Sequence, residues 1–181
     1  MSDHLQDDNI ERVFAAFDLD GNGEISWDDF EAKARGVGRE FGLEVGSPEV
    51  QGLVEAYQEL WDYIRGADVD VDDVVTKAEF QEARGAGRLS TSELLEKWLV
   101  VSDRVFDVAD RDGDGYLDGN EFAGLYRGAG ITDPQVAEIA FAAMDVDTDG
   151  RIDRAELLAN VQGVFTATDE SMKGARMLSG G

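Results

Sequence analysis

Apolar residues recur along the chain at helical spacing, in stretches separated by acidic loops that contain glycine. The first stripe follows the i, i+3, i+4, i+7 rule and comprises Ile10, Val13, Phe14 and Phe17. The clearest helix begins at Ser47 and Pro48, an N-cap followed by a first-turn proline, and carries apolar residues from Val50 to Ile64. Both prolines of the chain lie where helices are expected to begin, so no predicted helix is interrupted. We predict an all-α fold whose apolar stripes face a core.

The predicted helices fall into two similar halves. Acidic loops begin at residues 18, 68, 110 and 145, each between two apolar stripes, so a helix–loop–helix unit occurs four times. One of the later stripes follows Pro134 and comprises Val136, Ile139, Ala140, Ala143 and Met144. A glycine-containing run at 85–88 interrupts the helical pattern between the second and third units. We therefore divide the chain into an N-terminal pair of units (1–86) and a C-terminal pair followed by a tail (87–181).

Two of the loops have all the features of a Ca²⁺-binding loop. Such a loop spans 12 residues, in which positions 1, 3, 5 and 12 offer side-chain oxygens, position 7 offers a backbone carbonyl, and glycine turns the chain at position 6. In loop 3 (110–121) the candidate ligands are Asp110, Asp112, Asp114, the Tyr116 carbonyl and Glu121. In loop 4 (145–156) they are Asp145, Asp147, Asp149, the Arg151 carbonyl and Glu156. An acidic turn that merely caps a helix explains this pattern poorly, because every position would have to match by accident twice.

Loop 1 (18–29) follows the same pattern except at its last position. Its candidate ligands are Asp18, Asp20, Asn22, the Glu24 carbonyl and Asp29. Aspartate is one methylene shorter than the usual glutamate, so Asp29 is expected to offer one oxygen instead of two. The loss of a ligand weakens the binding of Ca²⁺ relative to the smaller, six-coordinate Mg²⁺. We predict a metal site that is weaker for Ca²⁺ or more tolerant of Mg²⁺.

Loop 2 (68–79) keeps carboxylates at positions 1, 3, 5 and 12 but has Asp73 at the turn and Val71 at position 4. A residue with a Cβ pays roughly 1 kcal/mol or more in the left-handed conformation that the turn requires. We therefore interpret loop 2 as an empty loop that contributes Val75 to a short, two-residue β-ribbon with Ile25 of loop 1. A weak fourth metal site is the alternative.

Composition narrows the possible functions further. The formal net charge of −24 is unfavourable for binding nucleic acid or anionic lipid, and the absence of cysteine excludes disulfides and thiolate metal sites. The lone His4 cannot form a catalytic or metal site by itself. No stretch approaches the roughly 20 apolar residues of a membrane span, and the N-terminus lacks a secretory leader pattern. We expect a cytoplasmic monomer that binds Ca²⁺, with no nucleic-acid or membrane partner and with any protein target unidentified.

At family level, the segments DLDGNGEISWDDF, DRDGDGYLDGNEF and DVDTDGRIDRAEL resemble the EF-hand proteins of the calerythrin and sarcoplasmic calcium-binding type. The resemblance covers most of the chain, and the frequent arginine suits a GC-rich bacterial genome. It implies a compact globule in which loop 1 pairs with loop 2 and loop 3 with loop 4. It also implies Ca²⁺ in loops 1, 3 and 4, and a role in buffering, transport or signal modulation without catalysis.

Two further functions fit the sequence less well. A Ca²⁺ sensor exposes an apolar cleft to a target and often lines it with methionine, but here only Met144 lies on a clear apolar stripe. The calcium-triggered photoproteins resemble this chain in length and in an impaired second hand, but their chemistry relies on His–Trp–Tyr clusters that a single histidine cannot form. The tail after Phe165, with Met172 and Met177, either closes a cleft between the halves or is a disordered terminus.

Overall fold

The computed structural model describes the backbone of residues 2–18 and 20–166, and the side chains of residues 10–18 and 20–163. In chain order, the elements are α1 (Ser2–Phe17), β1 (Glu24–Ser26), α2 (Trp27–Glu40), α3 (Pro48–Ile64), the 3₁₀ turn η1 (Arg65–Ala67), β2 (Val74–Thr76), α4 (Lys77–Gly85), α5 (Thr91–Ala109), β3 (Tyr116–Leu117), α6 (Gly119–Gly128), α7 (Pro134–Met144), β4 (Ile152–Asp153) and α8 (Arg154–Thr166). The predicted all-α architecture of four helix–loop–helix units is confirmed. Within these described ranges, no helix is both long and apolar enough to cross a membrane.

The two longest helices begin at serine N-caps, of which Ser47 was expected from the sequence. The Ser47 hydroxyl accepts the N–H of Val50 (3.4 Å) at the start of α3, where Pro48 is the first helical residue. The Ser90 hydroxyl accepts the N–H of Glu93 (3.2 Å) at the start of α5. Because these caps satisfy N–H groups that a helix leaves unpaired, they fix where each long helix starts.

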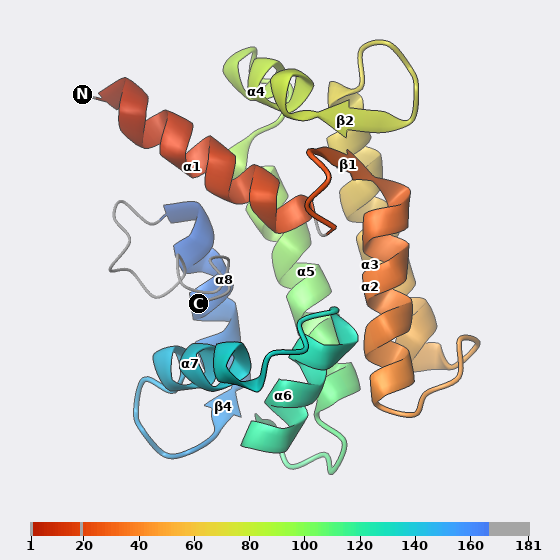
Figure 1. The fold of residues 1–181 in the computed structure, drawn as a ribbon, viewed down its shortest axis with the longest axis vertical. Coiled ribbons are helices and arrows are strands. Elements are labelled where there is room, and N and C mark those ends of the chain that lie inside the picture. Colours follow the sequence, from red (N-terminus) through yellow and green to blue (C-terminus); the bar gives the residue numbers. More distant parts are fainter. Residues whose placement is uncertain (1, 19, 167–181) are drawn as a thin grey trace.

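Short antiparallel ribbons join the loops in two pairs. Strand β1 pairs with β2, with Ile25 opposite Val75, and β3 pairs with β4, with Leu117 opposite Ile152. These four side chains occupy position 8 of their loops and are fully buried. The ribbon between loops 3 and 4 has two residue pairs, as predicted, whereas that between loops 1 and 2 has three. Figure 1 shows β1 and β2 at one end of the molecule and β4 at the other.

A single hydrophobic core runs through both pairs of units. Helix α5 lies in the middle of the view in Figure 1 and packs against α3 on one side and α8 on the other. Helix α2 also packs against α6, and the two approach closely where Gly36 meets Gly128. A Cβ on Gly128 would lie 2.7 Å from the Cα of Val37, so glycine is required at this crossing. The division at residues 86 and 87 stays a prediction from sequence.

The predicted core stripe of α7 is partly wrong. Ile139 is 51% exposed, whereas Ala137, Ala140 and Met144 are buried. Phe141 packs against the core instead, with its ring centroid 5.4 Å from that of Phe122. Helix α7 therefore presents a face that is rotated from the one that the apolar pattern predicts, because large and small apolar residues surround this short helix on several sides.

Candidate metal centre

Carboxylate side chains converge in each of the four loops. In loops 1, 3 and 4, the converging groups stand at positions 1, 3 and 12, and their oxygen atoms lie within 4.8 Å of one another. They are Asp18, Asp20 and Asp29; Asp110, Asp112 and Glu121; and Asp145, Asp147 and Glu156. In loop 2, the converging group is instead Asp68, Asp70 and Asp72, at positions 1, 3 and 5. Hard oxygen ligands at this separation are the arrangement that Ca²⁺ prefers.

The same hydrogen bonds shape all four loops from within. One carboxylate oxygen at position 1 accepts the N–H of position 6, over 2.9 Å in loops 1 and 4, 3.0 Å in loop 2 and 3.1 Å in loop 3. The side-chain oxygen at position 5 accepts the N–H of position 7 over 2.8 to 3.0 Å. These bonds turn the backbone around the cluster. In loops 1, 2 and 3, the residue at position 7, whose carbonyl is a candidate ligand, is also the first residue of a ribbon strand. The acidic side chains therefore build the loop as well as offering ligands.

The side chain at position 12 is fixed by hydrogen bonds at the N-terminus of the helix that follows each loop. In loop 3 the Asp118 carboxylate caps α6 and accepts the N–H of Glu121 (2.8 Å), while Glu121 accepts the N–H of Asp118 (3.0 Å). The same reciprocal bonds join Asp153 to Glu156 in loop 4. This capping box explains how residues at positions 9 and 12 serve both the helix and the metal site, because it fixes the carboxylate at the edge of the loop.

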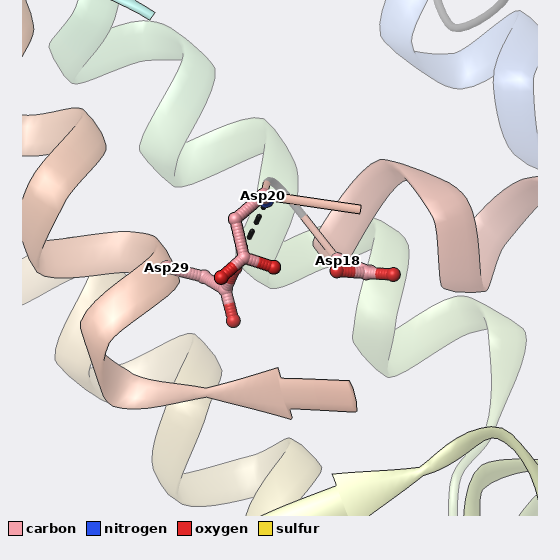
Figure 2. A group of neighbouring side chains, drawn as sticks. All are labelled: Asp18, Asp20 and Asp29. Atoms are coloured by element: carbon pink, nitrogen blue, oxygen red, sulfur yellow. Dashed lines mark hydrogen bonds between the residues drawn. The ribbon is translucent and has the colours of Figure 1, made fainter. Parts of the chain in front are cut away.

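Loop 1 brings its shorter carboxylate into the cluster from the first turn of α2. Asp29 is 4% exposed and accepts the N–H of Ser26 (2.9 Å) and the N–H of Asp20 (3.1 Å). Figure 2 shows Asp29 and Asp20 facing each other, with Asp18 beside them at the end of α1. Burial raises the pKa of Asp29 above its ordinary value, although the two backbone N–H groups oppose this effect. A bound cation would offset the cost of keeping this buried carboxylate charged.

Loop 3 carries the clearest sign that its ligands fit a cation. The Oδ2 atom of Asp110 accepts the N–H of Gly115 (3.1 Å), but its Oδ1 atom is buried and has no hydrogen-bond partner among the described residues. A buried acceptor without a partner costs about 1–3 kcal/mol, and more when it is charged. Since Asp112 and Glu121 converge on the same point, a divalent cation is the partner that this oxygen fits.

Loop 2 adopts the same backbone conformation as the other loops, but with strain at two residues. Positions 4 and 6 are left-handed in all four loops, with glycine at both positions in loops 1 and 3. In loop 2 these positions hold Val71 (φ 60°) and Asp73 (φ 65°). The Val71 side chain is 75% exposed, so packing does not compensate for the strain. An exposed ion pair of Asp73 with Arg65 (3.2 Å) contributes little.

One strained residue was missed from the sequence. Thr148, at position 4 of loop 4, also has a positive φ of 58°, although the ligand and turn positions of this loop all match. Its hydroxyl donates to the carbonyl of Asp147 (2.7 Å), a contact within the loop. The sequence contains a signal for this strain, because loops 1 and 3 both have glycine at position 4, where loop 4 has threonine. His4, Met172 and Met177 lie outside the residues whose side chains are described.

Comparison with known proteins agrees with this geometry. The family model for the EF-hand domain pair matches residues 102–162, and that for a single EF hand matches residues 10–32. Calerythrin of Saccharopolyspora erythraea is 29% identical over 171 residues, covering 90% of this chain and 93% of calerythrin. The probable calcium-binding protein CML16 of Oryza sativa subsp. japonica is 32% identical over 146 residues, covering 80% of this chain and 72% of CML16.

Solved structures show the same fold. A Streptomyces coelicolor calcium-binding protein superposes with a TM-score of 0.74 at 31% identity, covering 88% of this chain and 97% of that one. The photoprotein clytin, at 23% identity and a TM-score of 0.69, shares the fold. The chain therefore belongs to the EF-hand calcium-binding proteins. Within that family it is calerythrin-like, as the resemblance of its loop sequences implied.

Proposed function

We propose that the protein is a Ca²⁺ buffer or transporter that holds Ca²⁺ in loops 1, 3 and 4. The observation that carries this assignment is the composition of the carboxylate clusters. In these three loops the position-12 carboxylate joins positions 1 and 3, which is the closure that encloses a cation. In loop 2, Glu79 accepts backbone N–H groups as its counterparts do, but the converging cluster consists of positions 1, 3 and 5, in a loop strained at Val71 and Asp73. We assign loop 2 a structural role as the partner of loop 1 in the ribbon.

The full ligand set under this proposal follows the loop positions. It comprises Asp18, Asp20, Asn22, Glu24 and Asp29 in loop 1; Asp110, Asp112, Asp114, Tyr116 and Glu121 in loop 3; and Asp145, Asp147, Asp149, Arg151 and Glu156 in loop 4. The pKa of Asp147 is raised: the N–H of Asp149 opposes the shift, but desolvation and the charges of Asp149 and Glu156 outweigh it. Crowded charges of this kind are relieved by a cation, which supports metal binding in loop 4. We propose Mg²⁺ as a competitor in loop 1.

Packing favours a buffer over a sensor. The apolar faces of both pairs of units contribute to one core, in which α2 contacts α6 and α3 contacts α5. Met144 is 1% exposed and belongs to this core. The large apolar side chains exposed among the described residues are all valine or isoleucine, and include Val45, Val100 and Ile139. A sensor would need to separate packed helices before it could offer a groove to a target.

Chromatography on phenyl-agarose tests this choice, because a bead interacts with the outer surface of the protein and not with its interior. We expect the protein to pass through the column both in Ca²⁺ and in excess chelator. A calmodulin-type sensor loaded in parallel provides the positive control. Retention in Ca²⁺ followed by release in chelator would contradict the buffer assignment and support the sensor.

A regulatory role is the second candidate. The structure of the Streptomyces coelicolor relative is described as a basis for prokaryotic calcium-mediated regulation. Such a role requires a Ca²⁺-dependent change at a surface, and the chromatography above detects it when that surface is apolar. CML16 and the Streptomyces coelicolor relative are both described as calcium-binding proteins. A cytoplasmic location, monomeric state and unidentified protein target stay proposals from sequence.

A further inference from the structure

A cavity of about 240 Å³ lies between the two pairs of units, and of the loop carboxylates its lining includes Asp18 of loop 1. Seven of the helices described contribute to its wall, and only α4 does not. Its aromatic lining comes from both halves of the chain and comprises Tyr57, Trp98, Phe122 and Tyr126. A void of about 150 Å³ is large enough to hold benzene, so this cavity can accommodate a molecule of two or more rings.

Two charged residues belong to the cavity wall, Lys33 of α2 and Asp18 at the start of loop 1. The Asp18 carboxylate is directed into its own loop, because its Oδ1 accepts the N–H of Asn22 (3.1 Å) and its Oδ2 that of Gly23 (2.9 Å). Lys33 is half-buried and has no ion-pair partner among the described residues, in a chain with a net charge of −24. Of these two wall residues, Lys33 is therefore the one whose charge is not already engaged within a loop.

The other polar groups of the wall are neutral. Burial raises the pKa of Tyr126 to about 12 and raises the pKa of Tyr57 above its ordinary value, so both phenols keep their protons. Burial also lowers the pKa of Lys33 to about 8, which reflects the cost of an ammonium that lacks a counter-ion. An anionic group placed beside Lys33 would remove part of that cost, because it replaces lost solvation with an ion pair.

We propose that this cavity binds a small organic anion with an apolar body of two or three rings, whose anionic group pairs with Lys33. The apolar and aromatic wall supplies most of the binding free energy, since it excludes water from the body of the ligand. The single ammonium supplies orientation and selectivity for an anion over a neutral molecule of the same shape. The site adjoins loop 1 through Asp18, but the proposed contacts with the ligand do not pass through a bound cation.

Two fluorescent probes test the proposal because they share one ring skeleton and differ in charge. They are 1-anilinonaphthalene-8-sulfonate, an anion, and N-phenyl-1-naphthylamine, its neutral counterpart. Each is titrated into the full chain, once in Ca²⁺ and once in chelator, and saturable binding of the sulfonate at one site in either condition is expected. Lys33→Met should weaken binding of the sulfonate about tenfold or more, because a charged hydrogen bond is lost. Binding of the neutral probe should change by less than about twofold.

Lys77→Met is the matched control, because it removes the same charge from an exposed lysine on α4 that pairs with Glu11. It should leave binding of both probes unchanged. A second variant, Ser102→Phe, fills the cavity from its buried wall and should weaken both probes. Circular dichroism establishes that each variant is folded. Equal affinity of the sulfonate for the wild type and for Lys33→Met would overturn the proposal, whether or not Ser102→Phe folds, and so would the absence of saturable binding.

Discussion

Loop 2 and loop 3 present identical carboxylates, with aspartate at positions 1, 3 and 5 and glutamate at position 12. They also share the hydrogen bonds from position 6 to position 1 and from position 7 to position 5. They differ at the two left-handed positions, which are Gly113 and Gly115 in loop 3 but Val71 and Asp73 in loop 2. At about 1–2 kcal/mol per residue, the strain in loop 2 totals roughly 2–4 kcal/mol. The ligand residues alone therefore do not define such a site. The backbone must also adopt the loop conformation without a large strain energy.

The largest expected effect is the loss of one site when position 12 is neutralised in loop 3. Glu121→Gln removes a charged ligand, and ligand charge sets the affinity of these loops, so Ca²⁺ binding at loop 3 should weaken by about 100-fold or more. Glu79→Gln makes the same change in loop 2 and should leave the number of bound Ca²⁺ ions unchanged. Calorimetric titration of both variants measures this difference. An equal loss of Ca²⁺ in the two variants would contradict it.

A smaller effect is expected from repairing loop 2. The double substitution Val71→Gly/Asp73→Gly gives this loop the turn residues of loop 3, and it should create an additional Ca²⁺ site. The free energy of unfolding should also rise by about 1–2 kcal/mol, because the relief of strain exceeds the entropy cost of two glycines. Calorimetry and chemical denaturation in chelator measure the two quantities.

Val69→Gly is the control for that repair. Val69 stands at position 2 of the same loop, is 57% exposed, and is not among the residues with a positive φ. Its replacement should add no site and should lower the free energy of unfolding by about 1 kcal/mol or less. If the double variant binds no more Ca²⁺ than the wild type, strain is not what distinguishes loop 2 from loop 3.

The smallest effect extends the comparison to loop 1. Asp29→Glu supplies the side chain found at position 12 of the other three loops. It should tighten Ca²⁺ binding by about tenfold and reduce competition by Mg²⁺, because a second carboxylate oxygen favours the larger ion. Asp28→Glu adds the same methylene at the adjacent exposed position and should change neither quantity. Competition titrations with Mg²⁺ would contradict the account if both variants behaved alike.

Much of this arrangement could be predicted from the sequence because the information is local. The acidic loops, the pairing of Ile25 with Val75 and the N-cap at Ser47 each follow from residue types at fixed positions of a motif. The strain at Thr148 was missed although a β-branched residue at position 4 counts against loop 2 through Val71, and the same reasoning applies to loop 4.

Other features could not be predicted because they depend on residues that are far apart in the chain. The crossing of α2 and α6 at Gly36 and Gly128 joins positions in different halves, and neither glycine belongs to a motif. The cavity beside Lys33 is likewise formed only when helices from both halves pack together. Ile139 shows the limit of periodicity itself, because a helix with apolar residues on several sides does not specify which side is buried.

Isothermal titration calorimetry of the wild-type protein with Ca²⁺, in the absence of Mg²⁺, tests the central claim most directly. We expect three bound Ca²⁺ ions, one in each loop whose position-12 carboxylate joins the cluster. The Glu79→Gln variant should give the same stoichiometry as the wild type. A stoichiometry of four that falls to three in Glu79→Gln would show that loop 2 binds Ca²⁺ despite its strained turn, and would contradict the account.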